Sequence, residues 1–168
     1  MKNLVIGQSG GPTAVINASL YGAVKAFRES GADGHVLGMI NGIEGFLADH
    51  VMDLSTDLSD EELELLKLTP AAYLGSCRYK LPADLDSKVY PAIFDNFREM
   101  NIGYFLYVGG NDSMDTVDKL SRYAEKIGSN VKFIGIPKTI DNDLVLTDHT
   151  PGFGSAAKYV ASTVREIV

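Results

Sequence analysis

The stretch NLVIGQSGGPTAVINASL, residues 3–20, indicates the fold class of the chain. Its first six residues centre on an apolar run, as in a strand that is buried on both faces. From Ile16 onward, apolar residues recur at helical spacing as far as Gly31, which is typical of an amphipathic helix. Gly10 and Gly11 separate the two patterns. The stretch therefore predicts a strand, a glycine-rich turn and a helix in succession.

Beyond this stretch, apolar patterns of strand type and helix type alternate along the chain. Strands are predicted at residues 3–8, 35–40, 104–110 and 131–137, and helices at 59–68, at 111–128, from 154 onward and in a segment that ends near Met100. This alternation indicates a three-layer α/β sandwich with a mainly parallel, Rossmann-like sheet. Ligands of such sheets bind beyond the carboxyl ends of the strands, so a site is expected in the loops that follow the strands.

Two segments lack a clear apolar period. Residues 41–49, NGIEGFLAD, are predicted to be a loop, and so are residues 69–82, which we expect to cross toward the site of the domain. Between them, the helix predicted at 59–68 has a well-defined start, because Ser59 followed by Glu62 is a capping-box pattern.

Length and composition are those of an ordinary globular protein. The chain has 168 residues, of which 45% are hydrophobic and 22% are charged, so one domain with one sizeable core is expected. No apolar run approaches the roughly 18 residues of a membrane helix, and the N-terminal residues lack the pattern of a secretory signal. We therefore expect a soluble, cytoplasmic protein that does not bind a membrane.

Charge and cysteine content exclude several kinds of site. The formal net charge is −7 and the acidic residues are spread along the chain, which argues against nucleic-acid binding. Cys77 is the single cysteine, so it forms neither an intrachain disulfide nor a cysteine metal cluster, and we expect a packed thiol. The histidines, His35, His50 and His149, share no ligand spacing, so a zinc site is not expected.

The glycine pair Gly10 and Gly11 lies between a strand and a helix, where a phosphate can bind. Glycine lets backbone N–H groups approach a phosphate closely, and the helix N-terminus adds a partial positive charge. The loop matches neither the P-loop nor the GxGxxG pattern. A tight turn without a ligand is therefore an equally good interpretation of this loop taken alone.

A second glycine pair, in VGGNDSMD at residues 108–115, again separates a strand from a helix. Asn111, Asp112 and Ser113 are all good helix N-caps, so capping alone would explain these three residues. Capping does not explain two glycines, because a turn needs only one. We therefore favour phosphate binding at Gly110 and the start of this helix.

The third strand end, IPKTIDNDL at residues 136–144, carries two carboxylates in one turn. Asx residues are common in turns, which is the alternative explanation, but Asp141 and Asp143 provide more acceptors than a turn requires. One carboxylate would suit taking a proton from an attacking hydroxyl, and the other holding a hard cation such as Mg²⁺. Thr139 is a candidate to hydrogen-bond a substrate hydroxyl or phosphate.

Lys138 and Arg78 supply positive charge near these loops. The planar guanidinium of arginine matches the oxygens of a phosphate, and both side chains attract an anion locally in an acidic domain. Together the three loops indicate phosphoryl transfer. GFGSAA at residues 152–157 fits the GxGxxA dinucleotide pattern, but no strand leads into it, so dinucleotide binding is not expected.

These motifs carry a resemblance to a known family. They are SGGPTAVIN at 9–17, YLGSCR at 73–78, GGNDS at 109–113, PKTIDND at 137–143 and TPGFGSAAKY at 150–159. In this order and spacing they resemble the N-terminal part of the phosphofructokinase family, over the whole chain. The resemblance implies a step of glycolysis, the transfer of phosphoryl to the 1-hydroxyl of fructose 6-phosphate, catalysed by positioning and charge stabilisation.

The resemblance also implies roles for individual residues. Asp141 is similar to the general base of the family, and Arg78 to a residue that stabilises charge in the transition state. Lys138 and Thr139 are expected at the transfer site, and Thr139, Asp141 and Asp143 match positions that contact the sugar substrate. The residues that match donor-phosphate positions are Gly10, Gly11, Arg78, Gly110, Asp112, Ser113 and Lys138.

Two positions bear on the identity of the phosphoryl donor. ATP-dependent members of the family usually have glycine where this chain has Asp112 and Lys138, which leaves room for the inner phosphate of the nucleotide. Both places are filled here, and a carboxylate at Asp112 would repel a nucleotide phosphate unless Lys138 offsets it. The resemblance is therefore to the pyrophosphate-dependent branch, with an ATP-dependent 6-phosphofructokinase as the alternative.

Mg²⁺ is the cofactor that the resemblance implies. The usual acidic residue of the family after the second glycine pair is Asn111 in this chain, and an amide oxygen ligates Mg²⁺ without charge. We therefore expect Asp143 to carry most of the metal binding, with Asn111 as a weaker candidate ligand.

The C-terminal pattern and the resemblance together indicate a fragment. The helix that begins near residue 154 reaches Val168 without a glycine or a cap. We expect residues 1–168 to be an N-terminal donor-binding domain that lacks the second, sugar-phosphate domain and is inactive alone, and the full-length protein to be a homo-oligomer. The rival interpretation is a phosphate-binding module without catalysis, which would not need Asp141.

Overall fold

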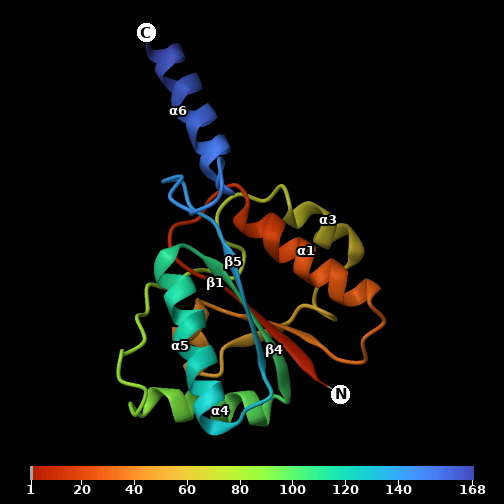
Figure 1. Cartoon of the computed structure of the whole chain (residues 1–168). Coiled ribbons are helices and arrows are strands. Elements are labelled where there is room, and N and C mark those ends of the chain that lie inside the picture. Colours follow the sequence, from red (N-terminus) through yellow and green to blue (C-terminus); the bar gives the residue numbers. More distant parts are fainter. Residues whose placement is uncertain (1) are drawn as a thin grey trace.

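The computed structural model describes residues 2–168 and contains one five-stranded sheet (Figure 1). The strands are β1 (Asn3–Gln8), β2 (Val36–Met39), β3 (Val51–Asp53), β4 (Ile102–Gly109) and β5 (Lys132–Pro137). Their order across the sheet is β3-β2-β1-β4-β5. β1 pairs in parallel with β2 and β4, β4 pairs in parallel with β5, and β3 runs antiparallel to β2. The predicted, mainly parallel sheet is confirmed.

Helices cover both faces of the sheet, which gives the three predicted layers. They are α1 (Ile16–Glu29), α2 (Gly42–Leu47), α3 (Asp60–Leu66), α4 (Val89–Glu99), α5 (Asn111–Ile127) and α6 (Phe153–Ile167). α1 and α3 pack over an aliphatic core on one face. α2, α4 and α5 pack on the other, where Phe97 and Phe105 belong to a cluster of aromatic rings. Burial of these two apolar faces is the main stabilising contribution to the fold.

The helix predicted at residues 59–68 is found as α3, and its capping box is present. The N–H of Glu62 donates to Ser59 Oγ at 3.2 Å, and the N–H of Ser59 donates to Glu62 Oε2 at 2.9 Å. These bonds satisfy two N–H groups that a helix start leaves without intrahelical partners.

The prediction of a loop at residues 41–49 is wrong, because this segment contains α2 and leads into β3. α2 has only six residues, which is too short for an apolar period to be recognised. It follows Asn41, whose φ of 59° lies in the left-handed region, and it buries Ile43 and Phe46 completely. The sequence does not predict β3 either, since its three residues are too few to show strand alternation.

The segment at residues 69–82 contains neither helix nor strand, as predicted. It is nevertheless fixed to the domain, because Leu74, Cys77 and Leu81 are buried and the N–H of Leu74 donates to Gln8 Oε1 at 2.9 Å. We call this segment the crossing loop. Its buried side chains hold the exposed residues between them, including Arg78, in a defined place.

α6 projects away from the rest of the domain (Figure 1), and none of its side chains is buried. Its exposed apolar residues include Tyr159, Val160 and Val164, which are 72%, 59% and 55% exposed. Neither α6 nor any other helix within residues 2–168 is long and apolar enough to span a membrane.

Candidate active site

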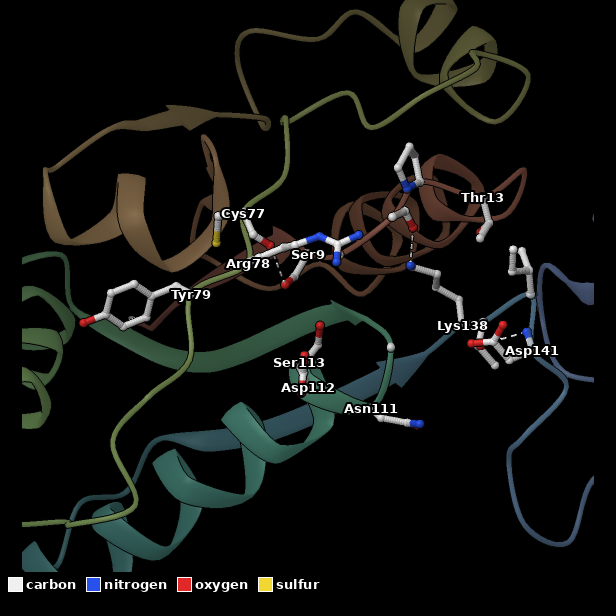
Figure 2. Close-up of a pocket in the computed structure, with 16 residues that line it drawn as sticks. Ser9, Thr13, Cys77, Arg78, Tyr79, Asn111, Asp112, Ser113, Lys138 and Asp141 are labelled. Carbon is white, nitrogen blue, oxygen red and sulfur yellow. Dashed lines mark hydrogen bonds between the residues drawn. The ribbon is translucent and has the colours of Figure 1, made fainter.

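A cavity of about 520 Å³ lies beyond the carboxyl ends of β1, β4 and β5 (Figure 2). Residues 9–13, 77–79, 110–113 and 138–141 line it. β1 and β4 are the neighbouring strands at which the strand order reverses, and ligands of open α/β sheets bind at such a place. The three loops identified from the sequence therefore meet in one cavity, together with the crossing loop.

The first glycine loop is built against the crossing loop. Gly10 has a φ of 74°, in the left-handed region that glycine adopts without strain. Its N–H donates to the carbonyl oxygen of Cys77 at 3.1 Å, and its own carbonyl oxygen accepts from Ser76 Oγ at 2.5 Å. At Gly11, no atom lies within 4 Å of the place that a Cβ would take. Gly11 therefore leaves the cavity open.

The second glycine loop leads into α5 without a side-chain cap. Gly110 is the N-cap residue of α5, and no side chain forms a capping hydrogen bond there. The alternative that capping explains Asn111, Asp112 and Ser113 is therefore wrong. Gly109 has a packing role, since a Cβ at this position would lie 1.9 Å from Ser113 Oγ. Ser113 is buried, whereas Asp112 is exposed at the cavity.

Lys138 is only 4% exposed and reaches from the end of β5 to the first glycine loop. Its ammonium donates to the carbonyl oxygen of Gly11 (Figure 2). Burial lowers the pKa of Lys138 below its ordinary value of 10.5, and the positive charge of Arg78 lowers it further. An anion bound beside the ammonium would oppose both effects, because it stabilises the charged form.

Arg78 extends from the crossing loop into the space that Lys138 faces (Figure 2). Within residues 2–168, no ion pair joins either of these cations to a carboxylate. Two positive charges therefore lie near each other, and neither takes part in an ion pair. This arrangement favours a bound phosphate, whose oxygens match both an ammonium and a guanidinium.

Thr139 and Asp141 line the cavity and are fixed by the chain that follows them. The N–H of Asp141 donates to Thr139 Oγ1 at 3.0 Å, and Thr150 Oγ1 donates to the carbonyl oxygen of Thr139 at 3.1 Å. Thr139 also pairs with Gly152 in an isolated β-bridge. These contacts hold the backbone of Asp141 while its side chain stays exposed.

Asp143 lies outside the residues that line the cavity, beside Asn111. Asn111 Nδ2 donates to Asp143 Oδ2 at 2.8 Å, so the two candidate metal ligands are adjacent. A carboxylate and an amide supply the hard oxygen ligands that Mg²⁺ takes in proteins. Within residues 2–168, no group of three or more His, Cys, Asp or Glu could hold a metal ion. A Mg²⁺ ion here would therefore take further oxygens from a bound phosphate or from water.

Known proteins share both the sequence and the fold of this chain. A family profile described as Phosphofructokinase matches residues 3–168. The chain belongs to the phosphofructokinase family. It is 46% identical over 167 residues to the pyrophosphate–fructose 6-phosphate 1-phosphotransferase of Halomonas elongata, an alignment that covers 98% of this chain and 39% of that protein. It is 40% identical over 162 residues to the sulfofructose kinase of Alkalicoccus urumqiensis, covering 96% of this chain and 40% of that protein.

A solved structure of a relative has the same fold as this phosphofructokinase chain. The pyrophosphate-dependent phosphofructokinase from Nitrosospira multiformis matches it with a TM-score of 0.91 at 43% identity. The match covers 99% of this chain and 41% of that one. The chain thus spans about 40% of the length of the relatives that it matches.

Several residues that line the cavity of this phosphofructokinase chain were not assigned to a site from the sequence. They are Ser9, Pro12, Thr13, Cys77, Tyr79 and Ile140. Cys77 is a packed thiol, as predicted, but its carbonyl oxygen also accepts from Ser9 Oγ at 3.2 Å, and this bond joins two walls of the cavity. Each of these residues lies within two positions of a predicted site residue. Extending each predicted site by two residues on either side would therefore have included them.

Replacing Lys138 with methionine is expected to stabilise this phosphofructokinase chain. Because the pKa of Lys138 is lowered in the folded state, the unfolded chain binds more protons between that lowered pKa and 10.5. The destabilising effect of the buried ammonium is therefore complete below this window and declines as the pH rises through it. Lys138→Met should raise the free energy of unfolding by about 0.5–2 kcal/mol near neutral pH.

Urea unfolding of both chains, measured near neutral pH and again near pH 10, checks this expectation. The stability difference between Lys138→Met and the unmodified chain should shrink at the higher pH. A difference that stays constant with pH would show that the Lys138 ammonium is not destabilised by burial.

Proposed function

We propose that residues 1–168 form the donor-binding domain of a longer enzyme that transfers phosphoryl from pyrophosphate to the 1-hydroxyl of fructose 6-phosphate. The observation that supports this proposal is that Lys138 and Arg78, neither of them in an ion pair, lie near each other in a cavity that Asp141 also lines. The names of the Halomonas and Nitrosospira relatives support it.

Pyrophosphate binding is proposed between the two glycine loops. Gly11 and Gly110 let the backbone approach the donor, and the N-terminus of α5, whose first residues line the cavity, adds partial positive charge. Lys138 and Arg78 would then contact the phosphate oxygens directly. The donor would then provide both side chains with an anionic partner.

In the proposed reaction, Asp141 acts as the general base. Its carboxylate takes the proton from the 1-hydroxyl of the sugar as that oxygen attacks the near phosphorus atom of pyrophosphate, and inorganic phosphate leaves in line. Thr139 positions Asp141 through the hydrogen bond to its N–H. Arg78 and Lys138 stabilise the charge on the transferring group, so catalysis rests on positioning and electrostatics.

Pyrophosphate is proposed as the donor because of the residues at two places in the cavity. The side chain of Asp112 lines it at the start of α5, and that of Lys138 crosses it to Gly11. Both occupy space that a longer nucleotide donor would need. An ATP-dependent 6-phosphofructokinase is the alternative, and it requires that both side chains move aside.

Mg²⁺ is proposed to bind together with the donor. Asp143 would be its charged protein ligand and Asn111 a neutral one, with pyrophosphate oxygens completing the set. The ion would lower the negative charge that the attacking hydroxyl meets. Asp143 is also proposed to contact the sugar substrate, next to Thr139 and Asp141.

The sugar site is proposed to lie mainly outside this chain, which spans about 40% of the length of its relatives. A sulfofructose kinase is 40% identical over this region, so similarity over this region does not by itself assign the acceptor. A second domain for the sugar phosphate, a homo-oligomeric full-length protein and a cytoplasmic location all stay predictions.

Calorimetric titration of the 168-residue chain with magnesium pyrophosphate, and separately with magnesium ATP, tests the donor. We expect pyrophosphate to bind and ATP to bind at least tenfold more weakly. Lys138→Met should remove pyrophosphate binding, whereas Lys88→Met, which removes an exposed lysine outside the cavity, should leave it unchanged. Equal or tighter binding of ATP would favour the ATP-dependent alternative.

A further inference from the structure

Lys80 forms an ion pair with Asp112 at the mouth of the cavity. The Nζ atom of Lys80 lies 3.2 Å from Asp112 Oδ1, and the two side chains are 71% and 73% exposed. Lys80 does not line the cavity itself, but it lies two residues after Arg78 on the crossing loop. Among the charged residues that the structure describes, Lys80 is the ion-pair partner of this carboxylate.

The backbones that carry the pair are held relative to each other. Leu81, next to Lys80, is buried, and its carbonyl oxygen accepts from Lys119 Nζ at 3.0 Å. Lys119 belongs to α5, the same helix whose first turn carries Asp112. The crossing loop is therefore attached to α5 next to the ion pair. Only the two side chains, and not their backbones, need to be ordered for the pair to form.

The ion pair matters because the negative charge of Asp112 would oppose the binding of an anionic donor. If pyrophosphate occupies the cavity, a carboxylate stands beside an anion, which is unfavourable unless a cation lies near. The sequence suggests Lys138 for this task. In the structure, however, Lys138 donates to the carbonyl oxygen of Gly11, and it is Lys80 that pairs with Asp112.

We propose that Lys80 is a specificity-determining residue that acts through Asp112. Its ammonium positions the Asp112 carboxylate and neutralises it, so that Asp112 blocks a larger donor by its volume without repelling pyrophosphate by its charge. Lys80 is thus a positioning residue, whereas Lys138 and Arg78 contact the donor. This inference rests on the proposed pyrophosphate-dependent function.

Removing the Lys80 ammonium should weaken donor binding without lowering the stability of the fold. An exposed ion pair contributes little to stability, so the unfolding midpoint of Lys80→Gln should match that of the unmodified chain. Unpaired, the Asp112 carboxylate would oppose the donor, and the KM for magnesium pyrophosphate should rise about tenfold. kcat and the KM for fructose 6-phosphate should stay within about twofold, because neither depends on the charge at Asp112.

The experiment compares Lys80→Gln, Asp112→Asn, the double variant and Lys80→Arg in the full-length protein. Because Lys80 acts through Asp112, the double variant should have the same KM for pyrophosphate as Asp112→Asn within about threefold. Lys80→Arg should retain the KM of the unmodified protein, since arginine also neutralises a carboxylate. Lys88→Gln, which also removes one exposed positive charge, is the matched control and should change nothing.

The outcomes separate this inference from the function on which it rests. If the unmodified protein uses pyrophosphate but Lys80→Gln leaves its KM unchanged, the role of Lys80 is refuted and the proposed function stands. A double variant as impaired as Lys80→Gln would also refute it, because Lys80 would then act independently of Asp112. If the unmodified protein neither binds nor uses pyrophosphate, both the proposed function and the role of Lys80 are refuted.

Discussion

Asp141→Asn in the full-length protein should lower kcat by about 100- to 10,000-fold while leaving the affinity for magnesium pyrophosphate within about threefold. Asparagine has the size and shape of aspartate but does not accept a proton from the sugar hydroxyl. The N–H of residue 141 would still donate to Thr139 Oγ1, so the loop should keep its conformation. Steady-state kinetics give kcat, and calorimetry gives donor binding.

Asp148→Asn is a suitable control for this variant. Asp148 is an exposed carboxylate in the same segment, but it does not line the cavity. Its replacement should leave kcat unchanged. Turnover that survives in Asp141→Asn would contradict the role of Asp141 as the base and would favour the rival interpretation, a phosphate-binding module without catalysis.

The double variant Asp112→Gly, Lys138→Gly should shift donor preference toward ATP. Removing both side chains opens the space at the start of α5 and beside Gly11. We expect the ratio of kcat/KM for ATP to that for pyrophosphate to rise about 100-fold, which corresponds to about 2.7 kcal/mol. Part of this change should come from weaker use of pyrophosphate, because we propose that Lys138 contacts it.

Asp115→Gly controls for the glycine that the double variant introduces into α5. Asp115 is also an exposed carboxylate in the first two turns of this helix, but it pairs with Lys119 and does not line the cavity. Replacing aspartate with glycine at either place should cost at most about 1 kcal/mol of helix stability. Asp115→Gly should show this loss of stability without a change in donor preference. If the double variant keeps its preference for pyrophosphate, exclusion of ATP does not depend on these two side chains.

Elements with a long apolar period could be predicted from the sequence, whereas short ones could not. β1 with α1, and β4 with α5, each combine an apolar run, a glycine pair and a sustained helical period. α2 and β3 have too few residues for a period. What holds them is burial of Ile43 and Phe46 and pairing with β2, both of which depend on the rest of the fold.

The location of the candidate site was predictable, but its internal contacts were not. Parallel strands place their carboxyl ends at one edge of the sheet, so loops that follow β1, β4 and β5 had to meet. The partners of Lys138 and Asp112 depend instead on the path of the crossing loop and on side-chain directions. Neither is encoded in a local pattern, so the ion pair between Lys80 and Asp112 could not be predicted from the sequence.

The start of α6 connects the cavity to a helix that projects from the rest of the domain. Gly152, which caps α6, forms the bridge with Thr139 and packs so closely on Thr13 that a Cβ would lie 3.1 Å from its side chain. Thr13 and Thr139 belong to two different walls of the cavity. α6, none of whose side chains is buried, is therefore attached at its start to two walls of the cavity at once.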